Sequence, residues 1–383
     1  MAVLKNVEKS FNRSIWLLYI LIVFEILYMI SPFALYYYSG YAIPLNLLQQ
    51  SPLTSWLTVY IFPHFTYNSS WLINALLTIS WPLIITGSLL FLVGFIQIYW
   101  AKFTKKDVVS KGLYKIIRHP QYVGLAILGL GATIYWSRFI VYIAYASMLF
   151  LYYFLAKQEE RICLVKYGTS YQDYLDSTGM FFPKFLEDKL PKFPEIIPKT
   201  RITRVFIKIM LFIVYLALII SIGFGIKVYT LTKISSVLDD KRVVIATAPL
   251  KDDQINHIVS LVMSDNRVTS MISDLKKEKQ LIYVVPSGWN VPELDIRGEG
   301  NINMILNTST HGNSLDFNRD LYSVLITEPV MFDSNAMGEN ILKTGISYIP
   351  LISANVDLEK NEVLAVERKS NRGKWDGIPV PIY

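Results

Sequence analysis

The sequence predicts a membrane protein of two parts: an all-α, five-helix transmembrane bundle with a helical hairpin, then a separate α+β extracytoplasmic domain. Three observations predict this fold class. Only 17% of the 383 residues are charged, against about 25% in an ordinary soluble domain, and the mean hydropathy is +0.36. Long apolar stretches occur only before residue 232, whereas residues 232–383 have ordinary polarity. So much apolar surface also excludes an intrinsically disordered chain.

The bundle is predicted from five apolar stretches, because a helix needs about 20 residues to cross a bilayer. They are Ile15–Tyr38, Trp71–Trp100, Tyr122–Trp136, Phe139–Ala156 and Val205–Leu231. The first is too long and too internal for a cleaved signal peptide. The third reaches only about 22 Å at 1.5 Å per residue. With Ser137 and Arg138 as the turn, the third and fourth stretches are therefore predicted to form a helical hairpin.

The orientation is predicted from the positive charges in the short loops. Lys and Arg gather in the N-terminal tail, between the second and third stretches, and after the fourth, whereas residues 39–70 contain none. Cytoplasmic loops carry such an excess. We therefore expect a multi-pass protein of the plasma membrane, with the N-terminus inside and residues 232–383 outside. A pI near 9.1 can indicate nucleic-acid binding, but the excess lies beside apolar segments, so the expected partner is the lipid bilayer and no nucleic acid.

The predicted domains are residues 1–204 as the membrane core, 205–231 as the last membrane helix, and 232–383 as the outer domain. Short β-rich runs predict strands at Arg242–Ala248, Gln280–Val285, Ile302–Asn307 and Leu321–Met331. Helical spacing of apolar residues predicts helices over Asp252–Met263 and Val268–Lys277. Asp357–Val366 is predicted to form a β-hairpin around Lys360 and Asn361. The pattern assigns this domain no activity and leaves open an extracytoplasmic partner.

Polar chemistry brackets the predicted hairpin. KGLYKIIRHPQYVG precedes it and KQEERICLVKYGTSYQDYLDSTGMFFPKF follows it, so both ends are expected to meet at one cytoplasmic interface. Pro120 fits the first turn of a helix, which places His119 near a helix N-terminus that favours an anionic group. Glu159 and Glu160, expected at the far helix end, suit an ammonium or ribose hydroxyls. With Cys163 as its one cysteine, the chain has no CxxC site, and no metal is expected.

S-adenosylmethionine combines a carboxylate, an ammonium, a ribose and a sulfonium, although these residue types alone do not single it out. The same stretch resembles the superfamily of isoprenylcysteine carboxyl methyltransferases and phospholipid N-methyltransferases, which are integral-membrane enzymes. The matching residues are Gly112, Tyr114, Arg118-His119-Pro120, Tyr122, Gly124, Glu159-Glu160, Leu164, Tyr167-Gly168, Tyr171, Tyr174 and Pro183. The chain departs from the family pattern at Lys157, where many members have Arg, and at Cys163.

The resemblance implies a methyltransferase with S-adenosylmethionine as its cofactor, bound by His119, Tyr122 and Glu160. Gly129 and Gly131 match a Gly-x-Gly that serves the cofactor in the phospholipid branch. We expect Arg118 and Glu159 at the reaction centre, and Lys157, Arg161, Tyr171 and Tyr174 to bind a lipophilic membrane substrate of the prenylated-carboxylate or lipid-amine type. Methyl transfer needs mainly positioning of the two reactants.

Two other functions stay open. Membrane reductases of the steroid-reductase type, which use NADPH, share a similar Arg-His-Pro block, but Gln121 replaces their usual Asn and Leu125 follows Gly124 where they have an acid. The membrane part could also be a degenerate, non-catalytic anchor for a sensor or binding domain. In that case Arg118 and His119 would contact lipid headgroups, the two glycines would pack helices, and the tyrosines would form an interfacial belt.

Overall fold

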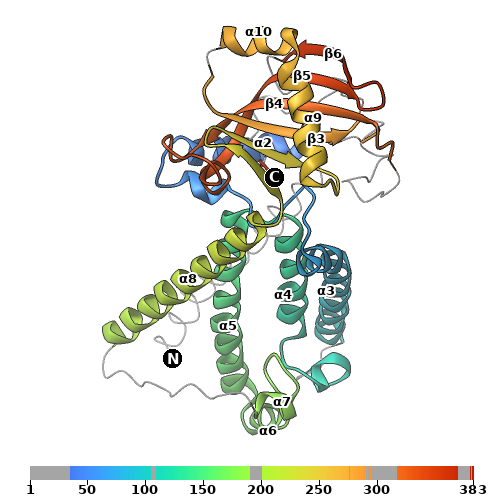
Figure 1. Ribbon diagram of the computed structural model, residues 1–383. Helices are drawn as coiled ribbons and strands as arrows, with labels where there is room; N and C mark the ends of the chain where they lie inside the picture. Colours follow the sequence, from blue (N-terminus) through green and yellow to red (C-terminus); the bar gives the residue numbers. More distant parts are fainter. Residues whose placement is uncertain are drawn as a thin grey trace. The chain divides into compact units, whose positions relative to one another are not determined.

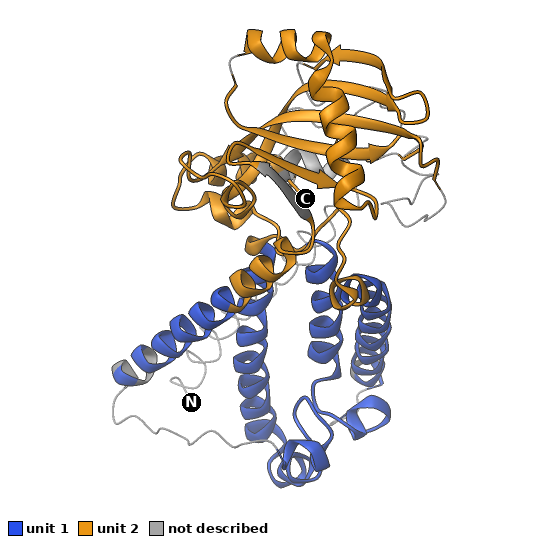
Figure 2. Ribbon diagram, viewed as in Figure 1, with its two compact units in different colours: residues 1–30, 76–136, 141–221 blue, residues 31–75, 137–140, 222–383 orange. Residues whose placement is uncertain are grey.

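The computed structural model describes residues 35–104, 109–189, 201–275, 277–289, 291, 294, 317–369, 380 and 382–383. Most of the first apolar stretch, and the strand expected at Ile302–Asn307, lie outside the described residues. The chain divides into two compact units (Figure 2). Unit 1 comprises residues 1–30, 76–136 and 141–221, and unit 2 comprises residues 31–75, 137–140 and 222–383.

Long helices dominate the membrane part of the chain (Figure 1). They are α3 (Trp71–Phe103), α4 (Pro120–Tyr135), α5 (Phe139–Tyr167) and α8 (Arg201–Leu231). Among the described residues, three segments are long and apolar enough to cross a membrane: Trp71–Ala101, Phe139–Tyr167 and Phe206–Leu231. This confirms a membrane helical part. The count of five membrane helices stays a prediction, because α4 has only 16 residues and most of the first stretch is not described.

Helix α5 continues eleven residues beyond the expected end at Ala156. The added segment, KQEERICLVKY, consists largely of residues with good helix propensity. The helix therefore continues beyond the end of the apolar stretch. Glu159 and Glu160 therefore lie within α5, whereas the sequence predicted them at the end of this helix.

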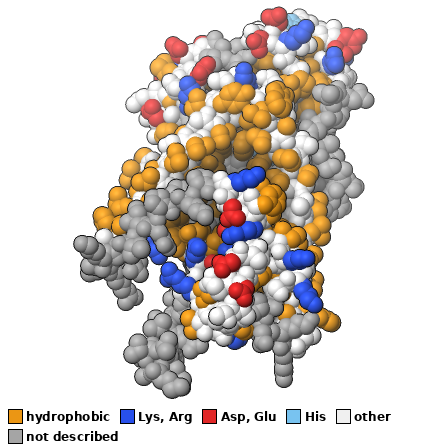
Figure 3. Space-filling view, turned by 90° about the horizontal axis from the view of Figure 1, so that it is seen from below, with side chains coloured by type: hydrophobic (Ala, Val, Ile, Leu, Met, Phe, Trp, Pro, Cys, Tyr) orange, Lys and Arg blue, Asp and Glu red, His pale blue; other side chains and the backbone are white. Residues whose placement is uncertain are grey.

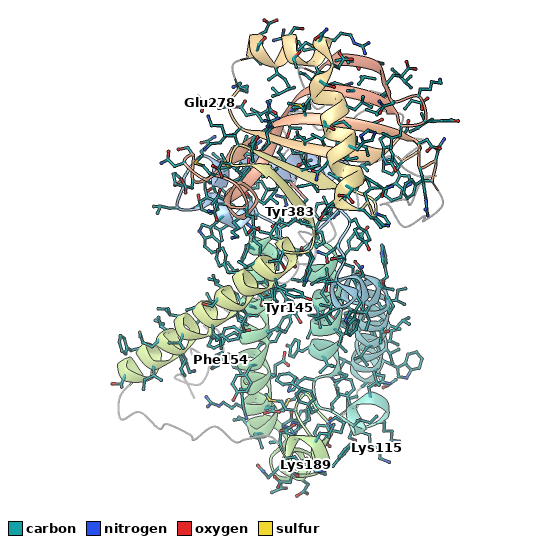
Figure 4. All side chains as sticks on the ribbon, viewed as in Figure 1. Lys115, Tyr145, Phe154, Lys189, Glu278 and Tyr383 are labelled. Atoms are coloured by element: carbon teal, nitrogen blue, oxygen red, sulfur yellow. The ribbon has the colours of Figure 1, made fainter. Side chains whose placement is uncertain are left out.

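Short elements surround this part of unit 1: η3 (Gly112–Lys115), α6 (Thr169–Ser177) and α7 (Lys184–Glu187). Lys115 and Lys189 lie at the end of the unit where α6 is found (Figure 4).

Helices α3 and α4 pack closely through glycines. A Cβ added to Gly87 would lie 2.3 Å from the backbone nitrogen of Leu128, and one on Gly124 would lie 2.5 Å from that of Phe91. Only glycine allows two helix backbones to approach so closely. Tyr145, labelled in Figure 4, joins α5 to α4 by donating a hydrogen bond to the carbonyl of Ala126 (2.8 Å). These contacts fix the hairpin of α4 and α5 within unit 1.

Unit 2 is built on one sheet, with six strands among its described residues in the order β1-β2-β3-β4-β5-β6. Their bounds are Ser235–Asp239, Arg242–Ala246, Gln280–Pro286, Leu321–Met331, Gly345–Asp357 and Glu362–Arg368. Only β2 and β3 pair in parallel, and α9 (Asp252–Ser264) and α10 (Asn266–Leu275) connect them. The sheet confirms an α+β region. The hairpin around Asn361, whose φ is +52°, is also confirmed, whereas β1 and most of β5 were not predicted.

Both faces of the sheet are covered. Apolar side chains of α9, such as Ile258, pack with Val244, Ile282 and Val324 on one face. On the other face Tyr283 contacts the ring of Phe65 at 5.8 Å, measured between ring centroids, and donates a hydrogen bond to the carbonyl of Ile382 (2.8 Å). The second face is therefore covered at Tyr283 by Phe65 and by the segment that contains Ile382.

The turn between α4 and α5 belongs to unit 2. The carbonyl of Ser137 accepts a hydrogen bond from the backbone of Ile61 (2.8 Å). Arg138 is fully buried, donates to the carbonyl of Thr58 (2.8 Å) and lies 4.7 Å from the ring centroid of Tyr60. The unit also contains α2 (Leu35–Gln49) and η2 (Ser55–Thr58). Residues expected to form only an outer loop thus take part in the core of this unit.

Tyr383 anchors the same segment. Its side chain is fully buried, and its hydroxyl donates to the carbonyl of Tyr60 (2.5 Å). The backbone of His64 donates to the carbonyl of Tyr383 (3.1 Å). The stretch around residue 60 is consequently bonded to the hairpin turn on one side and to Tyr383 on the other.

Candidate active site

The site begins where two segments of unit 1 pair side by side. Ile117 and Gly179 form a parallel β-bridge, and the backbone N–H groups of Arg118 and His119 donate to the carbonyls of Gly179 (2.8 Å) and Met180 (3.1 Å). Pro120 then occupies the first turn of α4, with His119 as its N-cap residue. A proline at this position lacks only an N–H that would have no partner within the helix. The chain after α6 thus returns to the start of α4.

Arg118 and Glu160 form a buried ion pair across the hairpin. The Nε of Arg118 lies 2.6 Å from the Oε1 of Glu160, and both side chains are 7% exposed. The same guanidinium donates through Nη1 to the carbonyl of Leu175 (3.0 Å) and to that of Thr178. Arg118 therefore connects the start of α4 with α5 and the end of α6 through its Nε and Nη1 atoms.

His119 lies between the two glutamates. Its Nδ1 is 3.6 Å from the Oε2 of Glu159, and its Nε2 is 3.5 Å from the Oε1 of Glu160. The side chain is only 8% exposed, yet Nε2 has no hydrogen-bond partner among the described residues. A buried polar atom left in this way costs about 1–3 kcal/mol. His119 Nε2 is thus suited to receive a polar group of a ligand.

Tyr122 connects this charged cluster to the buried apolar residues of α4 and α5. Its hydroxyl donates to the Oε1 of Glu159 (2.7 Å). Its ring lies nearly parallel to that of His119, at 5.5 Å between centroids and 16°, and nearly parallel to that of Tyr152, at 5.4 Å and 11°. Glu159 is 32% exposed, so of the two carboxylates it is the one that a molecule from outside can reach.

The structure brings together Arg118, His119, Tyr122, Glu159 and Glu160, the five predicted site residues at the two ends of the hairpin. One positive and two negative side chains, with a buried imidazole, make this cluster suited to an ammonium or to hydroxyl groups. Seen from the end that carries α6 and α7, Lys and Arg side chains lie next to Asp and Glu side chains, bordered by hydrophobic ones (Figure 3).

The predicted tyrosines of α6 face inward. Tyr171 is buried, and the hydroxyl of Tyr174 donates to the backbone carbonyl of Tyr114 (2.5 Å). Burial raises the pKa of Tyr174 to about 12 and also raises the pKa of Tyr114 and Tyr171. These three hydroxyls are therefore neutral at physiological pH, and that of Tyr174 joins α6 to η3.

The other predicted site residues lie elsewhere. Lys157 and Arg161 are exposed on α5. Gly129 and Gly131 lie about 14 and 17 Å along α4 from Pro120, at 1.5 Å per residue. A Cβ on Gly131 would be 2.6 Å from the carbonyl oxygen of Ser80 in α3. The structure does not bring these four residues into the cluster around His119.

Two contributors to the site were not predicted. Gln97 of α3 accepts a hydrogen bond from the backbone of Leu113 (3.2 Å), next to Gly112, whose φ of +65° favours glycine. Tyr152 supplies the ring against Tyr122. The glycine in the motif is a signal for the first contact, whereas Tyr152 stands in a run of apolar and aromatic residues and no local pattern distinguishes it.

Comparison with known protein families gives a match for part of the chain. Residues 71–170 match the family model described as phospholipid methyltransferase, which confirms for this part of the chain the resemblance inferred from its motifs. The matched range is about a quarter of the chain and contains α3, the Arg-His-Pro segment, the hairpin and the glutamate pair. No curated protein and no solved structure matches the chain.

Proposed function

We propose, from the match of residues 71–170 to the phospholipid methyltransferase family, that this chain is an integral-membrane methyltransferase that transfers a methyl group from S-adenosylmethionine to a lipophilic acceptor. The observation that carries the proposal is the buried cluster of His119, Glu159 and Glu160, in which His119 Nε2 lacks a hydrogen-bond partner among the described residues. When bound, S-adenosylmethionine would supply an activated methyl group on its sulfonium.

The residues present fit this cofactor. His119 Nε2 can bond to a polar group of the cofactor, and Glu160 can accept from an ammonium or a ribose hydroxyl. We assign Tyr122 to the orientation of Glu159, because its hydroxyl donates a hydrogen bond to that carboxylate. We assign Gly131 to packing against α3, because a side chain there would meet the backbone of Ser80, and we assign Gly129, buried on the same helix, a similar packing role.

Arg118 and Glu159 have different roles in this proposal. Arg118 neutralises Glu160 and fixes the segment from Leu175 to Thr178, so we propose that it positions the site. Glu159 is more exposed than Glu160 and is the carboxylate that can meet the acceptor. It can hold an amine in line with the methyl group and take up the proton that the amine must lose.

The acceptor that fits best is a lipid amine. A carboxylate acceptor would approach Glu159 and Glu160 with like charge, which disfavours it, whereas an amine is attracted. The exposed Lys157 and Arg161 would then contact anionic headgroups at the membrane surface. A lipophilic acceptor would enter from the bilayer, which explains why the site is built on membrane helices.

The charge distribution supports a cytoplasmic site. The Lys- and Arg-rich segments beside the cluster are of the kind found on the inner side, and residues 39–70 contain neither residue. We therefore propose a multi-pass plasma-membrane protein with its N-terminus inside and residues 232–383 outside, where a partner could reach them.

Binding of S-adenosylhomocysteine tests the cofactor assignment. We expect calorimetry to show binding by the wild-type protein and about 10-fold or greater weakening in His119→Ala and Glu160→Gln, because a hydrogen bond to a charged group contributes about 1.5–3 kcal/mol. Lys157→Ala, an exposed neighbour on α5, is the control and should bind normally. Unchanged affinity in both site variants would refute the assignment.

Transfer of label from S-adenosylmethionine tests the acceptor. Label should appear in a membrane lipid extract and not in a pool of soluble metabolites, and label confined to water-soluble products would contradict the proposal. Thermal stabilisation by NADPH would indicate a reductase of the steroid-reductase type. Stabilisation by neither ligand would favour a non-catalytic anchor.

A further inference from the structure

Tyr152 lies on the same side of α5 as the glutamate pair. It precedes Glu159 by seven residues, which is about two helical turns. The side chain is only 5% exposed. Its ring is nearly parallel to that of Tyr122, with 5.4 Å between centroids and 11° between planes. The ring of Tyr122 is also nearly parallel to that of His119. The three rings therefore lead from the charged cluster to the buried apolar residues of α4 and α5.

The apolar end of these three rings is packed tightly. Tyr152 and Tyr122 belong to one cluster of buried residues with Leu125, Met148, Leu155, Ala156 and Met180. Aromatic pairs add stabilisation beyond the area that they bury, and a tyrosine ring is fixed by only two side-chain torsions. Tyr152 is thus a rigid support for the ring of Tyr122.

The other end of Tyr122 touches the charged cluster. Its hydroxyl donates to Glu159 at 2.7 Å, whereas His119 Nδ1 is 3.6 Å from the second oxygen of that carboxylate. The orientation of Glu159 therefore depends strongly on where the ring of Tyr122 lies. A displacement of about 1 Å in a site of this kind can lower a rate about 100-fold.

We propose that Tyr152 is a positioning residue for the methyl transfer: it holds the ring of Tyr122 so that the Tyr122 hydroxyl keeps Glu159 aligned with the acceptor. This inference rests on the proposed function. Tyr152 acts through Tyr122 and Glu159, and it assists the reaction without supplying a bond to the cofactor through His119 or Glu160.

Kinetics of Tyr152→Leu and Tyr152→Phe test the proposal, with Tyr153→Leu as the matched control because Tyr153 is the next residue and is 46% exposed. We expect Tyr152→Leu to lower kcat about 10-fold or more and to leave S-adenosylhomocysteine affinity within about 3-fold. Tyr152→Phe, which keeps the ring, should restore kcat, and Tyr153→Leu should behave as wild type. An unchanged kcat in Tyr152→Leu, an equal loss in Tyr152→Phe, or a parallel loss of S-adenosylhomocysteine affinity would overturn the proposal.

A measurement that needs no activity separates this inference from the proposed function. 3-Fluorotyrosine placed at position 122 should give a ¹⁹F resonance that shifts in Tyr152→Leu and stays in place in Tyr153→Leu. An unmoved resonance in Tyr152→Leu would overturn the support of Tyr122 by Tyr152, whatever the activity. If the wild-type protein neither binds S-adenosylhomocysteine nor transfers a methyl group, the proposed function fails and the role of Tyr152 in the reaction fails with it. The ¹⁹F result would then still decide the packing role.

Discussion

The guanidinium of Arg118 lies 2.6 Å from the carboxylate of Glu160, and both side chains are buried. The two residues stand 42 positions apart at opposite ends of the hairpin of α4 and α5. Arg118 also bonds to the carbonyls of Leu175 and Thr178. One side chain thus fixes three segments around His119.

Replacing Arg118 by Met should destabilise the protein by about 3–5 kcal/mol, because it leaves the charge of Glu160 buried without compensation. In Arg118→Met/Glu160→Gln part of this loss should return, since no unpaired charge remains. Denaturant unfolding in detergent of the wild type, Arg118→Met, Glu160→Gln and the double variant gives the coupling free energy between the two residues. Purely additive losses would contradict an energetically important pair.

Gly87→Ala should weaken the packing of α3 on α4, because the new methyl group would lie 2.3 Å from the backbone of Leu128 and overpacking costs about 1–3 kcal/mol. Gly225→Ala is the matched control in another membrane helix, since nothing lies within 4 Å of a Cβ there. Thermal unfolding should show a lower midpoint for the first variant alone. Equal midpoints would contradict the close approach of the two helices.

Tyr174 should make stability fall at alkaline pH. Burial raises its folded-state pKa to about 12, above the value of about 10 for an unfolded chain, so between these values the unfolded form loses a proton that the folded form keeps. The stabilisation is fully present below about pH 10 and declines as the pH rises towards about 12. A titration followed by the ultraviolet absorbance of tyrosinate should lose a late-titrating group in Tyr174→Phe. If the variant loses an early-titrating group instead, the hydroxyl of Tyr174 is not buried as described.

Arg138→Met should loosen unit 2. The change removes the donor to the carbonyl of Thr58, which costs about 1–3 kcal/mol when an acceptor is left buried, and it removes the contact with the ring of Tyr60. Arg368→Met, at an exposed position of β6, is the control. Limited proteolysis should cut unit 2 faster in Arg138→Met alone. Equal rates would show that the hairpin turn is not part of the core of that unit.

The membrane class, the hairpin and the bracketing of the hairpin by the Arg-His-Pro and Glu-Glu segments followed from the sequence. Hydropathy identifies the apolar helices, and Pro120 marks the start of α4, since a proline is tolerated in the first turn of a helix. The strands Arg242–Ala246 and Leu321–Met331 could also be predicted, because each is rich in β-branched or aromatic residues, which favour strands. These features depend on local composition and spacing, which a single sequence contains.

Other features depended on the tertiary structure. Residues 117–119 meet residues 178–180, Tyr152 supports Tyr122, and residues 31–75 and 137–140 join the unit that contains the sheet. Each of these contacts joins segments that are distant in the sequence. Such a contact leaves no periodic pattern in either segment. The sequence by itself determined which residues have the chemistry for a site. Packing decided which of them meet, because the free energy of a buried contact depends on both partners and on the backbone that brings them together.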